Sequence, residues 1–108
     1  MGVYEIKEFA ENGSSPFADW QDRLDPVTAA RVDTCIRRLE SGNFGAAKHL
    51  RGGVFEPRLD FGPGYRVYYG LDGKTLVILL GGGGGDKRRQ SADIEAAVRR
   101  WETYLKGR

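Results

Sequence analysis

Apolar and polar residues alternate along residues 3–10, VYEIKEFA, and this two-residue period predicts a first β-strand. Ser15 and Asp25 then each stand directly before a proline, an arrangement typical of a helix start because the side-chain oxygen caps the helix and proline suits its first position. The apolar spacing after each pair predicts two consecutive helices, the second ending at Ser41 and the glycine that follows.

The second half of the chain predicts three strands, over residues 54–61, 65–71 and 74–80, because turn signals containing glycine separate three apolar runs. We expect them to form an antiparallel meander. The third run, LVILL, is apolar on both faces and should be the most buried. Five glycines at 81–85 end it, and we interpret most of them as a flexible connector.

A last helix is predicted from about Ser91, with Asp93 and Glu95 in its first turn. The predicted order is β-α-α-β-β-β-α, an α+β fold in one domain over residues 1–108. We expect an antiparallel sheet with the helices packed on one face and the other face open.

The composition, 40% hydrophobic and 30% charged, is that of a globular protein. No apolar run approaches the roughly 18 residues of a membrane span, and the first residues do not form a signal-peptide core, so we expect a cytoplasmic protein. A single cysteine, Cys35, lies within the apolar pattern of the second helix, and we interpret it as a core residue.

Charge is unevenly divided along the chain. Residues 1–47 hold five Lys and Arg against eight Asp and Glu, whereas residues 48–108 hold twelve against seven. A polyanion partner such as a nucleic acid would suit the second part. An excess this mild is typical of an ordinary solvated surface, and charge alone favours that interpretation.

One predicted hairpin gathers charged groups. If Phe61 pairs with Tyr65, one face of the two strands carries Glu56, Arg58, Asp60, Arg66 and Tyr68. The DKRRQ stretch at 86–90 then follows the neighbouring strand.

Guanidinium groups suit a phosphodiester because their forked donors match its oxygens, and a carboxylate or His49 could move protons. Exposed cross-strand ion pairs would explain the same residues without any activity. One histidine and one cysteine make no recognisable metal-ligand set, although a carboxylate site for magnesium stays open. The glycine run lacks the phosphate-loop pattern because Arg88 stands where serine or threonine is required.

The series KHL at 48–50, VFEPR at 54–58, DFGPGYRVYY at 60–69, GGGDKRRQ at 83–90 and DI at 93–94 resembles the addiction-module killer proteins, a HigB-like branch of the RelE/ParE toxin superfamily. The resemblance runs from about residue 4 to 104. It implies a type II toxin, an mRNA endoribonuclease that acts on the ribosome without a metal or cofactor, attacking the phosphate with the substrate's own 2′-hydroxyl.

The resemblance also implies site residues. Arg66 matches the main transition-state cation, with Arg58 and Lys87 as further catalytic cations. The remaining candidates for RNA binding or proton transfer are Lys48, His49, Glu56, Tyr68, Asp86, Arg88 and Gln90. We expect Arg66 on a surface strand with its guanidinium toward solvent, and Tyr68 could stack on a base.

One residue departs from the family pattern: Pro57 stands where an aliphatic residue is usual. Proline lacks a backbone donor, so we expect this strand at a sheet edge or with a bulge, which would shift Arg58 and Glu56.

The implied partners are the mRNA, the ribosome and a cognate antitoxin of the helix-turn-helix class, and no membrane is implied. Two alternatives stay open: a ParE-like inhibitor of DNA gyrase on the same fold, and an inactive relative with a regulatory or binding role.

Overall fold

The computed structural model describes residues 3–57, 59, 64–84 and 87–108, and it contains an α+β domain. Within these residues the helices are α1 (Pro16–Asp22), α2 (Pro26–Glu40) and α3 (Lys87–Gly107). The strands are β1 (Glu5–Glu8), β2 (Lys48–His49), β3 (Val54–Glu56), β4 (Arg66–Asp72) and β5 (Leu76–Gly83).

The two predicted helix starts are confirmed. The Ser15 side chain accepts a hydrogen bond from the Ala18 amide at 3.1 Å, and Asp25 caps α2 through Thr28 in the same way. The predicted end of α2 is confirmed too. Gly42 follows the last turn with a φ of 87°, a conformation that costs glycine little and side-chain-bearing residues more.

The sheet has the order β1-β5-β4-β3-β2 among the described strands. β3, β4 and β5 form the predicted antiparallel meander. The prediction of a wholly antiparallel sheet is wrong, because β1 runs parallel to β5, with Ile6 opposite Val77. β5 is largely buried, so the backbone N–H and C=O groups along both of its edges need a strand partner, and the N-terminal strand supplies the second one.

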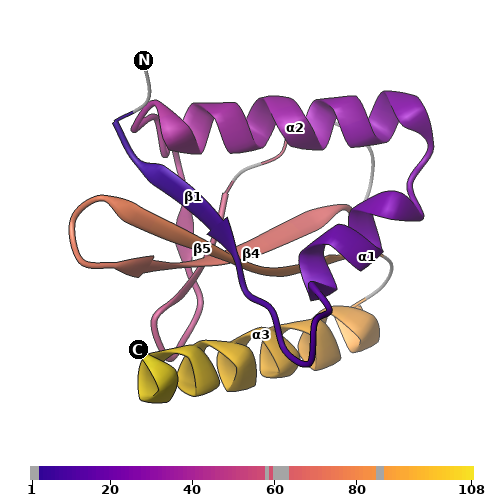
Figure 1. Cartoon of the computed structure of the whole chain (residues 1–108). Helices are drawn as coiled ribbons and strands as arrows, with labels where there is room; N and C mark the ends of the chain where they lie inside the picture. The colour runs from indigo at the N-terminus through magenta and orange to yellow at the C-terminus, as the bar shows by residue number, and fades with distance from the viewer. Residues whose placement is uncertain (1–2, 58, 60–63, 85–86) are drawn as a thin grey trace.

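Helices cover both faces of the sheet, which corrects the expectation of one open face (Figure 1). Val67 and Tyr69 of β4 pack with α1 and α2, whereas Tyr68, between them in sequence, packs with Ala97 and Trp101 of α3. Side chains alternate across a strand, so a strand that is apolar throughout needs cover on two sides.

α3 begins at Lys87, one turn earlier than predicted, so its first turn holds no acidic residue and Asp93 lies deeper in the helix. The glycine run also differs from its interpretation as a connector: residues 81–83 belong to β5 and pair with β4. A side chain at Gly82 would collide with the Trp20 ring. These glycines therefore allow close packing of α1 and α3 on the strand.

Pro57 ends β3 instead of marking a sheet edge, and β3 lies between β2 and β4. The hairpin register differs by two residues from the predicted one. Phe55 lies opposite Tyr69, where the prediction would place Pro57. Proline cannot donate to the ladder, while the Phe55 ring stacks on that of Tyr69 with centroids 5.6 Å apart. In the part of the chain described, no helix is both long and apolar enough to cross a membrane.

Candidate functional site

The candidate site lies between β4 and the first half of α3. Arg66 pairs with Gly83, and Tyr68 pairs with Gly81. The Arg66 and Tyr68 side chains therefore lie on the face of the sheet that α3 covers, each beside a glycine of β5. A side chain at Gly83 would collide with the Asp93 carboxylate, and one at Gly81 would meet the Arg100 guanidinium at 2.7 Å. Because both positions are glycine, the Asp93 carboxylate and the Arg100 guanidinium can approach the sheet closely.

A β-bulge fixes Arg100 beside this cluster. The β4–β5 register shifts between Tyr68 and Tyr69, which leaves Leu80 as an extra residue in β5. Arg100 donates from Nη1 to the carbonyl of Leu80 at 3.1 Å. This bond satisfies a backbone acceptor at the irregular point of the ladder and orients the guanidinium.

β3 and β2 add a carboxyl and an amine. Glu56 is half-buried at the end of β3, on the same face as Val54, which packs with the α3 side of the core. Lys48 pairs with Glu56 across the β2–β3 ladder. Glu56 therefore faces the positive charges of Lys48 and Arg66.

Burial changes the acid–base behaviour of this cluster. It raises the pKa of the Glu56 carboxyl above its ordinary value, and the charges of Arg66 and Lys48 offset part of that rise. It raises the pKa of Tyr68 to about 12, against the opposing effect of Arg66. The Glu56 Oε1 atom is buried and has no hydrogen-bond partner within the described part of the chain. Buried polar atoms of this kind are uncommon in proteins and point to a bound water or ligand.

Asp93 of α3 completes the cluster. Burial raises the pKa of its carboxyl, although three neighbouring guanidinium groups favour its charged form: those of Arg66, Arg100 and Arg89. The Asp93 charge also acts on Tyr68. Arg66 is therefore the cation that Glu56, Tyr68 and Asp93 share.

The structure places one predicted site residue away from this cluster. His49 lies opposite Phe55 and packs on its ring, with centroids 4.9 Å apart, so it belongs to the other face of the sheet. Lys87 and Arg88 are exposed in the first turn of α3, and Gln90 is half-buried beside them. The predicted roles of Arg58, Asp60 and Asp86 concern residues that lie outside the described ones.

Two expectations about exposure are corrected. Arg66 lies on an interior strand of the sheet, the residue is half-buried, and its Nε atom is buried. The Tyr68 side chain is 1% exposed because α3 covers it, so its ring cannot stack on a base in this conformation. The hydroxyl group is what Tyr68 offers to the site.

Sequence reasoning did not assign Asp93, Arg89 or Arg100 to the site. Their spacing held a signal, since 89, 93 and 100 recur at three-to-four-residue multiples along one helical stripe. The register of α3 against the glycines of β5 was not predictable, and it decides which of the helix's many charged residues face the sheet.

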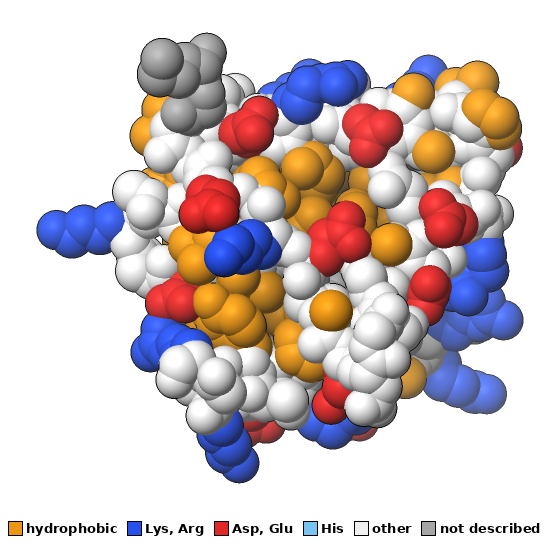
Figure 2. Space-filling model, in the orientation of Figure 1, with side chains coloured by type: hydrophobic (Ala, Val, Ile, Leu, Met, Phe, Trp, Pro, Cys, Tyr) orange, Lys and Arg blue, Asp and Glu red, His pale blue; other side chains and the backbone are white. Residues whose placement is uncertain are grey.

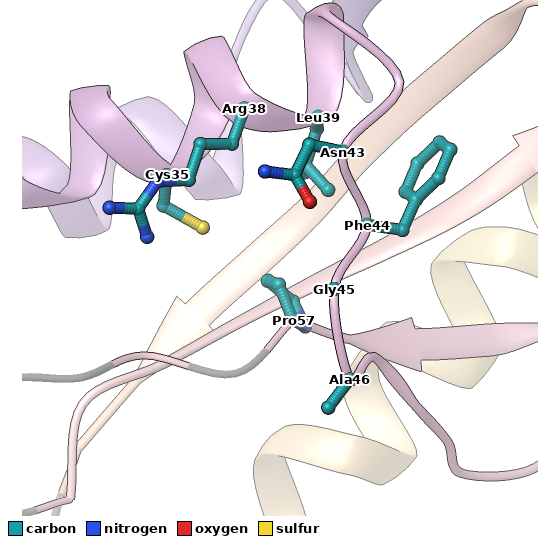
Figure 3. A pocket seen from close by; sticks show the side chains of 8 residues that line it. All are labelled: Cys35, Arg38, Leu39, Asn43, Phe44, Gly45, Ala46 and Pro57. Carbon is teal, nitrogen blue, oxygen red and sulfur yellow. The ribbon is translucent and has the colours of Figure 1, made fainter.

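The described residues contain no group of three or more His, Cys, Asp or Glu side chains placed to hold a metal ion. A separate pocket of about 230 Å³ lies on the opposite face, between α2 and residues 43–46 (Figure 3). Cys35 lines it, with Pro57 on the side away from α2. Burial raises the pKa of the Cys35 thiol to about 11, so the thiol is protonated at neutral pH and is a poor nucleophile.

Comparisons with known proteins give one partial match. No family model matches the chain. An uncharacterized protein of Haemophilus influenzae is 45% identical over 64 residues, which span 58% of this chain and 65% of that protein. The match therefore covers less than two thirds of the relative, whose description states no activity.

Proposed function

We propose that the protein is a toxin of the RelE/HigB type that cleaves mRNA on the ribosome. The observation that carries the proposal is the Arg66 cluster, in which one guanidinium lies among Glu56, Tyr68 and Asp93. A cation beside a proton acceptor is what cleavage of RNA by its own 2′-hydroxyl requires. The family resemblance, with Arg66 at the position of the main catalytic cation, supports the same activity.

In the proposed reaction, Glu56 accepts the proton of the 2′-hydroxyl. The 2′-oxygen forms a bond to the adjacent phosphorus, the bond from phosphorus to the 5′-oxygen breaks, and that oxygen takes up a proton from water. The products are a 2′,3′-cyclic phosphate and a 5′-hydroxyl. Arg66 stabilises the negative charge that grows on the phosphate oxygens.

The burial of Glu56 fits its role as a base. A carboxyl with an ordinary pKa is a weak base at neutral pH, and a raised pKa makes it a better proton acceptor while it remains ionised. Lys48 lies across the ladder from it and adds a second cation on the same face. A cognate antitoxin, encoded beside the toxin as a small helix-turn-helix protein, would keep this activity silent in the cell.

Induced expression without a partner tests the proposal. The parent chain should arrest growth, and translated mRNAs should acquire new 5′-hydroxyl ends within codons. Glu56→Gln keeps the size of the side chain and removes the base, and Arg66→Lys keeps the charge and removes the fork. Each should lower cleavage in a ribosome assay about a hundredfold, the effect of losing roughly 3 kcal/mol of transition-state stabilisation. Arg37→Ala, on the exposed side of α2, is the matched control and should cleave like the parent.

Circular dichroism and thermal unfolding of each variant separate a lost fold from a lost site. Full cleavage by folded Glu56→Gln and Arg66→Lys would overturn the assignment of the site. Growth arrest with intact mRNA and altered DNA supercoiling would favour a gyrase inhibitor over the proposed nuclease. Normal growth with the parent chain would indicate an inactive relative.

A further inference from the structure

A groove runs between α1 and the first half of α3, beside the glycine end of β5. It consists of two adjoining hollows of about 600 and 320 Å³, both lined by Trp20, Arg23, Gly82 and Asp93. The larger hollow is within the size range of small-ligand sites. Asp93 and Tyr68 line the groove and also belong to the Arg66 cluster, so the groove leads to the candidate site.

Small residues keep this groove open. Gly82, Gly83 and Gly84 line its strand side, and Ala92 and Ala96 line its α3 side. A side chain at Gly82 would occupy the place of the Trp20 ring. The aromatic wall therefore exists because the strand beneath it lacks side chains.

The charge of the groove is net positive. Arg23, Arg89 and Arg100 line it against Asp19 and Asp93. Asp19 already accepts a hydrogen bond from the Ser14 hydroxyl at 2.9 Å. Basic side chains also gather at the lower right of the molecule in Figure 2, next to the end at which α3 begins. An anionic ligand suits this balance.

Aromatic surface accompanies the cations. Tyr65 is half-buried and lines the larger hollow together with Trp20, Arg23 and Arg89. Unpaired RNA bases stack on aromatic rings, while guanidinium groups bind the phosphates between them. An acidic peptide would use the arginines but would gain little from the rings.

We propose that this groove binds a nucleotide of single-stranded RNA, with the base against Tyr65 and the phosphate held by Arg23 and Arg89. The inference rests on the proposed function, because it assigns the groove to the RNA segment that lies next to the bond cleaved at Arg66.

Binding of a fluorescein-labelled RNA hexamer with 2′-O-methyl groups at every position tests the proposal. Methylation blocks the attacking hydroxyl, so fluorescence anisotropy reports binding without cleavage. Tyr65→Leu keeps apolar bulk and removes the ring, and it should weaken binding about tenfold. Arg23→Ala and Arg89→Ala should each weaken binding. Each should also reduce the slope of log affinity against log salt concentration by about one.

Two exposed arginines outside the groove are the matched controls: Arg37→Ala on α2 and Arg99→Ala on α3. Both should bind the hexamer like the parent. Equal loss in groove and control variants would mean diffuse attraction of charge and would overturn the proposal. So would a labelled hexaglutamate peptide that binds as tightly as the RNA, depends on Arg23 and Arg89, and is unaffected by Tyr65→Leu.

The two proposals fail in distinguishable ways. If Glu56→Gln lowers cleavage about a hundredfold while the groove variants bind and cleave like the parent, the groove assignment is wrong and the nuclease stands. If the parent never cleaves RNA but binds the hexamer through Tyr65, Arg23 and Arg89, the nuclease is wrong and the groove stands.

Discussion

Arg100 of α3 donates a hydrogen bond from Nη1 to the carbonyl of Leu80, the extra residue of the β5 bulge, at 3.1 Å. The bond joins the helix to the sheet where the ladder is irregular. Burial lowers the pKa of Arg100, with the neighbouring charge of Arg99 adding to the effect, and the Asp93 carboxylate opposes it. One side chain thus completes the bulge and supports the carboxyl of the candidate site.

Replacing Arg100 by methionine should destabilise the fold. The change keeps an unbranched apolar stem but leaves the Leu80 carbonyl without its donor, which costs about 1–3 kcal/mol. Urea unfolding measures the difference. Arg99→Met, one residue earlier and exposed, should stay within about 0.5 kcal/mol of the parent. Equal unfolding free energies for the two variants would show that the bond contributes nothing.

A methyl group at Gly82 should cost stability because it would collide with the Trp20 ring. We expect Gly82→Ala to lower the free energy of unfolding by about 1–3 kcal/mol, the usual range for overpacking. In a Trp20→Ala background the same change should cost much less, since the obstructing ring is gone, and a double-mutant cycle measures this coupling. Gly107→Ala, where nothing lies within 4 Å of an added methyl, is the control. If the losses of unfolding free energy caused by Gly82→Ala and Trp20→Ala were additive, the contact between the two residues would be contradicted.

Glu56→Gln should raise stability at neutral pH while it lowers cleavage. The folded-state pKa of Glu56 lies above its unfolded value, so between the two values the folded protein holds more protons than the unfolded chain. The free energy of unfolding therefore falls as pH rises through that window, and glutamine, which resembles the protonated carboxyl, removes this fall.

Because Glu56 is only half-buried and lies among cations, the gain at pH 7 should stay below about 1 kcal/mol. Urea unfolding at pH values from about 4 to 7 gives the difference between variant and parent, which should grow with pH. Asp93 contributes with the same sign in both proteins and cancels from that difference. A variant that loses stability at pH 7 would show instead that the Glu56 charge stabilises the fold.

Cys35 should resist alkylation in the native protein. Its side chain is 6% exposed, and burial raises its pKa to about 11, so little thiolate is present at pH 8. Iodoacetamide labelling followed by mass spectrometry should show negligible modification of the folded chain and full modification in urea. Rapid native labelling would mean that the pocket beside α2 opens readily.

Local patterns in the sequence determined most of the elements, but not the short strand β2 or the first turn of α3. Ser15 and Asp25 cap the two N-terminal helices as predicted, because a cap depends on residues only three positions apart. The meander of β3, β4 and β5 follows equally from turn signals and alternation. That Glu56 and Arg66 share one face of adjacent strands could be anticipated from the alternation of side chains along each strand.

Tertiary structure decided the rest. The parallel pairing of β1 with β5, the cover of α3 over Tyr68 and the placement of His49 on the other face each depend on contacts between residues far apart in sequence. The glycines show the reason most clearly. Their sequence alone suits a flexible connector, yet Gly83 pairs with Arg66 in the sheet, and the Asp93 carboxylate occupies the space that a side chain there would need. A glycine fits many local conformations, and only the neighbours packed on it determine which one the chain adopts.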